Sequence, residues 1–130
     1  MISESAIVCQ VKPDDPKIVV LGVNSNVVSL NWESCGGNAG ERIILFSFKR
    51  QRPGTVVTEQ IASRSATEGG FTMIAPFQDG QKYDALAHQK LRIFNVQRNE
   101  EYVYTLEITY QTGGGLFLEE IFRVTVDVKG

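Results

Sequence analysis

Few residues of this chain could do chemistry, and their spacing favours structural roles. His88 is the only histidine among 130 residues, and no serine, cysteine or aspartate stands at a recognisable catalytic spacing from it. We therefore interpret His88 as a polar residue in the turn before a strand. The sequence has no nucleophile–base pair, no metal-ligand cluster and no cofactor loop. We predict that the protein is not an enzyme, acts on no small-molecule substrate, and binds no metal or cofactor.

Other chemistry-bearing residues have simpler interpretations. Asp14, Asp15 and Asp79 could suggest a calcium site, since hard cations prefer clustered oxygen ligands, but no D-x-D-x-D-G pattern accompanies them. Turn-forming aspartates are the better interpretation. The basic run 49–52 reads as a solvated turn. The glycines at 113–115 open no helix, so we interpret them as a flexible hairpin rather than a phosphate loop.

Composition and charge narrow the function classes. The chain has the length of one domain, with 42% hydrophobic and 22% charged residues, which is typical of a globular protein. A net charge of -2 gives no electrostatic case for binding nucleic acid or an anionic membrane. No apolar run reaches the ~18 residues of a membrane helix, and the first residues do not form a signal peptide. These features fit both a cytosolic protein and a mature secreted domain.

The order of residues predicts strands. Apolar residues alternate with polar ones, and clusters rich in glycine, proline, asparagine and aspartate separate the alternating runs. A helix could occupy only 64–68 or 96–100. We predict a β-sandwich or barrel. Its strands are expected at 5–11 and 17–22 (one strand split by prolines), 26–33, 42–50, 55–62, 71–76, 81–86, 90–95, 101–111 and 116–129.

The segment 91–106 resembles the E-to-F region of immunoglobulin variable-type domains. The family pattern is L-x-I-x-x-V, three residues, then D-x-G-x-Y-x-C. Leu91, Ile93 and Val96 match its first part, Glu100 stands in place of the aspartate, and Tyr104 falls on the tyrosine-corner position. The resemblance implies an all-β, two-sheet, V-set-like Greek key sandwich. It would cover residues 1–130 as one domain, with its core at about 5–129.

The same resemblance implies a core without the usual disulfide between the two sheets. Leu106 stands at one cysteine position, and Trp32 stands at the other, in the pattern Val28-x-Leu30-x-Trp32. The buried tryptophan of the family corresponds to Phe46, or to Ile44 in a shifted register. We expect Trp32, Phe46, Tyr104 and Leu106 to form the centre of the core, and the Tyr104 hydroxyl to bond to backbone near a turn.

Two further contacts follow from this family arrangement. Its first two strands run antiparallel, which places Cys9 near Cys35. A disulfide is expected there, and two unpaired thiols on neighbouring strands are the alternative. A disulfide would indicate an oxidising compartment. Lys82 takes the place of a family arginine and would pair with Glu100, with Arg64 or Arg98 as alternative partners.

The strands expected at 42–50, 101–111 and 116–129 correspond to the C, F and G strands of the family, and their outward side chains suggest an interface. If Phe46 and Phe122 point inward, alternation turns apolar and charged side chains to the outside of one sheet. An apolar patch with a charged rim is typical of protein interfaces, although isolated exposed apolar residues or a bulge at Gly115 would also explain the pattern. The candidate interface residues are Ile43, Leu45, Lys49, Glu107, Phe117, Glu119, Ile121 and Arg123.

We therefore expect an extracellular recognition or adhesion domain from a membrane-anchored parent protein. An Ig-type domain that replaces the usual disulfide with a different one is similar to the membrane-distal domains of invertebrate allorecognition receptors. That resemblance implies homophilic binding between opposing cells, to the same protein or to a related Ig-like receptor. The alternatives are a structural spacer in a larger ectodomain and a carbohydrate-binding β-sandwich module.

Overall fold

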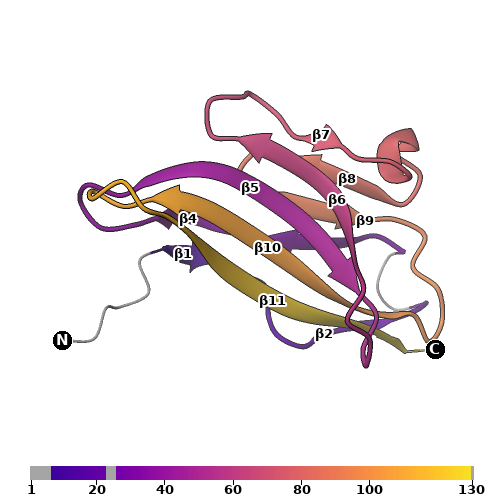
Figure 1. The fold of residues 1–130 in the computed structure, drawn as a ribbon. Helices are drawn as coiled ribbons and strands as arrows, with labels where there is room; N and C mark the ends of the chain where they lie inside the picture. The colour runs from indigo at the N-terminus through magenta and orange to yellow at the C-terminus, as the bar shows by residue number, and fades with distance from the viewer. Residues whose placement is uncertain (1–6, 23–25, 130) are drawn as a thin grey trace.

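The computed structural model describes residues 7–22 and 26–129 (Figure 1). Residues 5 and 6, which we assigned to the first strand, lie outside this part. In chain order its elements are β1 (Val8–Val11), β2 (Lys17–Val20), β3 (Val28–Asn31), β4 (Glu33–Gly36), β5 (Arg42–Gln51), β6 (Thr58–Ser65), β7 (Thr72–Met73), a 3-10 turn (Phe77–Asp79), β8 (Tyr83–Leu86), β9 (Lys90–Ile93), β10 (Glu101–Gln111) and β11 (Phe117–Lys129).

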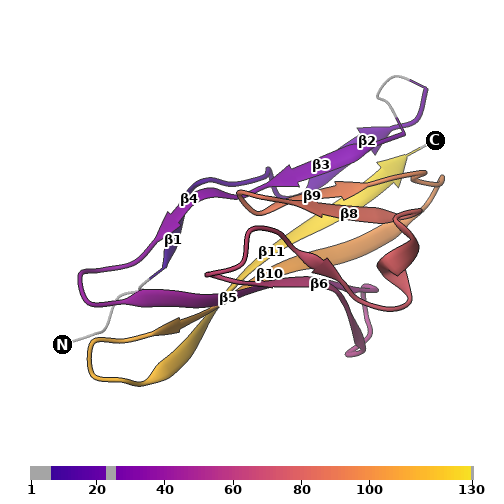
Figure 2. The same ribbon diagram turned by 90° about the horizontal axis from the view of Figure 1, so that it is seen from above.

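These strands form a two-layer sandwich (Figures 1 and 2). One layer is a six-stranded sheet in the order β2-β11-β10-β5-β6-β7, and the other is a three-stranded sheet in the order β3-β9-β8. Strands β1 and β4 form a separate two-stranded sheet, in which β4 runs on from β3 of the second layer (Figure 2). Strand β2 runs parallel to β11, whereas the other pairings are antiparallel. This is the predicted all-β, V-set-like immunoglobulin sandwich with Greek key connections. No helix in the described residues is long and apolar enough to cross a membrane.

The first strand is split between two partners. Strand β1 pairs with β4, whereas β2 pairs with the end of β11 in the six-stranded sheet. The segment between them contains Pro13 and Pro16, and a proline cannot donate a backbone hydrogen bond to a sheet. The chain therefore leaves one strand pairing and enters another at this point, and β1 does not continue along β11.

Alternating side chains fill the space between the layers. Trp32, Tyr104 and Leu106 are almost fully buried, and Phe46 is buried as well. The ring beside Trp32, however, is that of Phe48, with ring centroids 5.9 Å apart. Phe46 instead lies beneath the guanidinium group of Arg64, 4.7 Å from its ring centroid. The position expected for Phe46 in the Trp32 cluster was therefore two residues too early.

Three local predictions were wrong. Cys35 and Gly36, which lie beyond the strand predicted at 26–33, belong to β4 because they pair with Cys9 and Val8 of β1. Strand β6 begins three residues later and ends three residues later than predicted, at Thr58 and Ser65. The 3-10 turn at Phe77–Asp79 lies outside both segments considered for a helix, and Phe77 anchors it in the core.

Candidate interaction face

The outer face of the six-stranded sheet is formed by alternate side chains of β5, β10 and β11. Cross-strand partners share a face, and Leu106 pairs with both Phe48 and Phe122 on the inner side. Alternation from these positions fixes which side chains point out. They form three rows across the sheet, Leu45–Thr109–Glu119, Ser47–Glu107–Ile121 and Lys49–Thr105–Arg123.

The middle of this face is polar and charged. The ammonium group of Lys49 lies 2.8 Å from a Glu107 carboxylate oxygen. Ser47 and Thr105 are buried although they point outward, and the Gln60 amide donates a 3.3 Å hydrogen bond to the Ser47 hydroxyl. The apolar patch with a charged rim that we predicted is thus wrong in its arrangement. The charges lie at the centre of the face, and the exposed apolar side chains lie at one margin.

A pair of carboxyl groups extends the charged centre onto β11. Burial raises the pKa of Glu107, but the ion pair with Lys49, a hydrogen bond from Glu119 and the charge of Arg123 outweigh burial and hold this pKa below its usual value. The pKa of Glu119 is raised, because its carboxyl group bonds to Glu107 and faces that negative charge. Glu119 is therefore the carboxyl group of the pair that holds a proton more readily.

The apolar margin lies on β11 and the hairpin that leads into it. Leu116 is 66% exposed, Phe117 63%, Leu118 44% and Ile121 39%. Phe117 and Ile121 point to the outer face, whereas Leu118 pairs with Tyr110 and points to the other side of β11. Three consecutive apolar residues cannot all point to the same side of a strand, so at least one must face solvent. Our sequence analysis missed Leu116 and Leu118, and this run of three after the glycines was the signal that could have identified them.

One predicted member, Ile43, does not belong to this face. Pairing of β5 with β10 shifts register between Thr109 and Tyr110, so Tyr110 lies opposite Ile43 while Thr109 lies opposite Leu45. Ile44 is thus the extra residue of a β-bulge, which reverses the alternation beyond it. Ile43 consequently packs against the core. The other candidate residues, Leu45, Lys49, Glu107, Phe117, Glu119, Ile121 and Arg123, lie together on the outer face.

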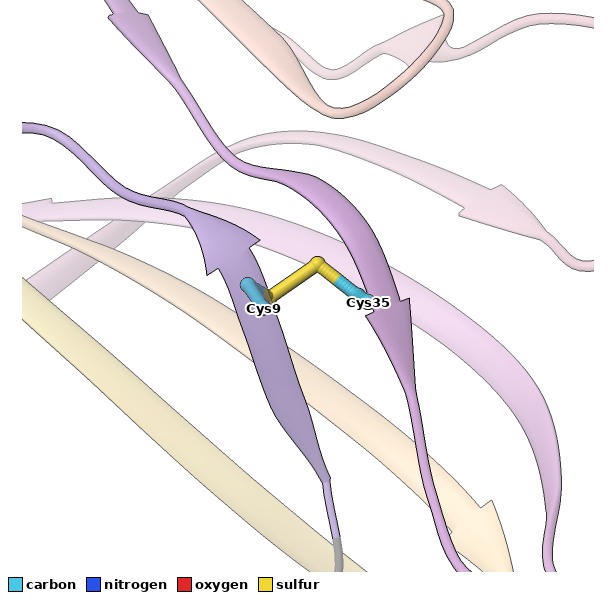
Figure 3. The surroundings of a disulfide bond; sticks show 2 residues. All are labelled: Cys9 and Cys35. Atoms are coloured by element: carbon cyan, nitrogen blue, oxygen red, sulfur yellow. A yellow bond between two sulfur atoms is a disulfide. The ribbon is translucent and has the colours of Figure 1, made fainter.

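A disulfide holds β1 on β4. Cys9 and Cys35 are direct cross-strand partners, and their sulfur atoms are bonded (Figure 3). Cys9 is buried, and Val8 beside it is exposed. The bond joins residues that are 26 positions apart in the sequence, so it restricts the conformations of the unfolded chain. In the folded chain it holds β1 against β4.

The opposite end of the sandwich is closed by a polar and aromatic cluster. The Arg50 guanidinium group lies 4.7 Å from the ring centroid of Phe77 and 4.5 Å from that of Tyr102. It donates a 2.8 Å hydrogen bond to the Tyr83 hydroxyl, which in turn lies 2.9 Å from the Tyr104 hydroxyl. Among the described residues, the Tyr104 hydroxyl therefore bonds to Tyr83 instead of making the expected backbone contact.

The expected ion pair lies at the same end of the sandwich. The ammonium group of Lys82 is 2.9 Å from the carboxylate of Glu100. Arg64, an alternative partner for Glu100, instead donates a hydrogen bond to the backbone oxygen of Glu68, at 3.1 Å.

The remaining candidate residues, His88, Asp79 and Asp15, have structural roles in turns and in a contact between distant segments. His88 lies in the turn between β8 and β9, at a φ of 66°. Asp79 accepts a hydrogen bond from the Gln81 amide, and Asp15 accepts one from the Thr125 amide. Within residues 7–22 and 26–129, no group of three or more histidine, cysteine, aspartate or glutamate side chains could hold a metal ion.

Comparison with solved structures supports the fold. Murine CRIg aligns with a TM-score of 0.67 and 17% sequence identity, over 97% of this chain and 100% of that chain. A chain from a structure titled as the structural basis of T cell specificity and activation by the bacterial superantigen toxic shock syndrome toxin-1 aligns with a TM-score of 0.63 and 10% identity, over 94% and 97%. No protein-family model matches, and neither does any curated protein. At these identities the likeness shows an immunoglobulin-like fold.

Proposed function

We propose that this domain is an extracellular recognition module that binds a second copy of itself through the outer face of the six-stranded sheet. In this proposal its parent protein is anchored in a membrane, and the contact forms between opposing cells, as in allorecognition. The fold is one on which recognition surfaces are built, but fold alone does not specify a partner. The partner must therefore be inferred from the side chains on the surface.

The observation that carries the proposal is the combination of groups on β11. Phe117 and Ile121 expose apolar surface, while Glu119 and Arg123 place opposite charges on the same face of the same strand. An exposed apolar cluster beside polar groups is characteristic of a protein contact. Because this short surface carries both signs of charge, a second copy can offer each charged group an opposite one.

The compartment follows from the disulfide. The only two cysteines of the chain are bonded to each other. Bonds of this kind persist in oxidising environments such as the cell exterior. A carbohydrate-binding role has less support, because Trp32, the only tryptophan, is 2% exposed and cannot stack on a sugar.

A weak contact suits this role. The exposed apolar strip is small, so a single pair of domains is expected to associate weakly. Many copies meeting across two membranes would add avidity without any new contact. A change of one charge on the surface can still abolish pairing, which is how a recognition protein separates partners.

The proposal is tested by sedimentation of the isolated domain at rising concentration, with Ile121→Asp as the disruptive variant. An aspartate here places an unpaired charge in the contact, so association should be lost while the fold persists. Val8→Asp is the matched control, because it puts the same charge at an exposed aliphatic residue on a different sheet. It should associate like the wild type.

Bead aggregation provides the multivalent readout. Beads coated with the wild type should aggregate, and beads coated with Ile121→Asp should not. A wild type that stays monomeric at millimolar concentration, on beads that do not aggregate, would overturn the proposal in favour of a heterophilic module or a spacer. Unchanged association of folded Ile121→Asp would show that this face is not the contact.

A further inference from the structure

The edge of the six-stranded sheet is covered along only part of β11. Strand β2 pairs with Val126–Lys129, the last residues of β11. The Thr125 amide is bound by the carboxylate of Asp15, at 3.0 Å. Before this point, from residue 117 to 124, the only strand of the described chain that pairs with β11 is β10, on its other side.

The backbone groups that face the open edge can be identified. Val128 donates its amide hydrogen to Glu100 on the β10 side, whereas Lys129 accepts from Leu21 and Thr125 donates to Asp15 on the other side. In an antiparallel pair, successive residues direct their backbone groups to alternate sides. Alternation therefore directs the backbone groups of Phe117, Glu119, Ile121 and Arg123 toward the open edge.

The surroundings leave room for an incoming strand. Figure 2 shows the β10–β11 hairpin set apart from β1 and β4, which pair with each other in a separate two-stranded sheet. A groove of about 290 Å³, lined in part by Lys12, Pro13 and Ile121, separates the β1–β2 connection from this stretch of β11. The proline-containing connection thus lies across the groove from residues 121–123 without pairing with them as a strand, and the groove is the space that a partner strand would enter.

This edge has only part of the usual protection. Exposed edge strands are normally short, or carry charged side chains, proline or a covering loop, because their free backbone groups template pairing with another chain. The open stretch of β11 carries the charged residues Glu119, Glu120 and Arg123 but no proline. Here the open stretch is long and carries the exposed side chains of Phe117, Leu118 and Ile121. An open edge with apolar side chains is suited to β-strand addition, in which a partner strand extends the sheet.

We infer that the partner strand is β11 of a second copy, paired antiparallel about a two-fold axis at Ile121. This inference rests on the homophilic function proposed above, and it narrows the contact from the outer face as a whole to the β11 edge of that face. In this register Glu119 of each copy faces Arg123 of the other, and the two Ile121 side chains meet at the centre. Opposite charges placed directly across a strand pair stabilise it, and like charges oppose it.

Other registers of the same pairing are worse. An axis at Glu119 or at Arg123 brings like charges face to face. An axis moved one residue from Ile121 in either direction places that isoleucine opposite a charged side chain. Charge complementarity thus selects one register.

Charge exchange between the copies tests the register. Glu119→Arg and Arg123→Glu each put two like-charged pairs into the dimer, so each variant alone should dimerise at least about tenfold more weakly than the wild type. A mixture of the two variants restores both opposite-charge pairs and should form heterodimers at nearly wild-type affinity. Sedimentation of each variant and of the mixture, with thermal unfolding to verify the fold, gives the readout.

The outcomes separate this inference from the proposed function. Restoration in the mixture supports the register. A wild type that associates, with variants that associate equally well or a mixture that is not restored, overturns the edge pairing and leaves the homophilic function standing. A wild type that does not associate overturns both.

A cross-link gives a second, independent test. Hydrogen-bonded residues of an antiparallel pair have Cα atoms about 5.5 Å apart, within the range that a disulfide spans. Ile121→Cys should therefore form a covalent dimer under mild oxidation. Thr109→Cys on β10 is the control, since three strand spacings of roughly 5 Å each would separate its two copies. Cross-linking of Thr109→Cys but not Ile121→Cys would indicate a face-to-face contact and overturn the edge pairing.

Discussion

The two halves of β11 follow the same alternation but have different surroundings. In the second half, Val124, Val126 and Val128 are buried, and β2 pairs with its edge. In the first half, Phe117 and Ile121 are exposed, and β10 is the only strand of the described chain that pairs with it. The difference shows that the alternation of apolar side chains in a strand does not determine whether they are buried or whether another strand pairs with its edge.

The cause lies elsewhere in the chain. The prolines at positions 13 and 16 divide the first strand, so that β2 covers the end of β11 while β1 pairs with β4 in a separate sheet. The disulfide between Cys9 and Cys35 holds β1 there. An edge that a continuous first strand could have covered thus remains open for a partner.

The largest expected effect contrasts the same substitution in the two halves. Val126→Asp buries a charge without a partner, so the domain should lose at least ~3 kcal/mol of stability, or fail to fold. Ile121→Asp should cost under ~1 kcal/mol, because its side chain is partly exposed on the outer face. Urea unfolding of both variants measures the difference. Equal losses would mean that the first half is as tightly packed as the second.

Removal of the disulfide should have the next largest effect. The double substitution Cys9→Ser and Cys35→Ser removes a bond between residues 26 positions apart in the sequence. The unfolded chain then gains conformational freedom, so the free energy of unfolding should fall by about 3 kcal/mol. Self-association of the folded fraction should persist, because the bond does not touch β11. A variant that folds but no longer associates would show that β1 forms part of the contact.

A smaller effect is expected at the closed end of the sandwich. Tyr104→Phe removes one partner of the buried 2.9 Å contact with the Tyr83 hydroxyl, which should cost about 1 kcal/mol. Tyr110→Phe is the control, since its ring is also buried but its hydroxyl lies outside this pair. Thermal unfolding compares the two variants. If both have equal effects, the hydroxyl pair does not stabilise this end.

The smallest expected effect is a pH dependence of self-association. In the free domain the pKa of Glu119 is raised by Glu107, while Lys49 opposes that rise and the charge of Arg123 acts on Glu107. In the dimer, Arg123 of the partner would lower the Glu119 pKa, so pairing releases a proton. Association should therefore strengthen as pH rises toward the raised pKa and level off above it. Sedimentation at several pH values between roughly 4 and 7 measures this, because the ordinary pKa of a glutamate lies near the lower limit and the raised pKa of Glu119 lies above it. Glu119→Gln should abolish the dependence.

Much of the fold could be predicted from the sequence, because alternation and turn residues act locally. Alternation in 101–111 and 116–129 indicated the central hairpin, and the Leu91–Leu106 segment indicated the order of the strands. Two contacts followed from the family resemblance. Cys9–Cys35 joins the paired strands β1 and β4, and Lys82–Glu100 joins the starts of β8 and β10, which belong to different sheets.

The rest depends on interactions that local patterns do not encode. The bulge at Ile44 arises where β5 must follow β10, and nothing in its own residues marks it. The contacts of Arg50 join side chains from several elements, so their proximity appears only after the layers pack. The open edge of β11 results from the path of the connection between β1 and β2, which lies near the other end of the chain.

Residue-resolved amide hydrogen exchange, at low and at high protein concentration, tests whether two copies pair through the open edge of β11. The amides of Glu119, Ile121 and Arg123 face the open edge, so they should exchange quickly in the dilute domain and slow markedly when it associates. The amide of Val128, already bonded to Glu100, should be protected at both concentrations. Edge amides that exchange at the same rate at both concentrations, while sedimentation shows dimers, would contradict the account.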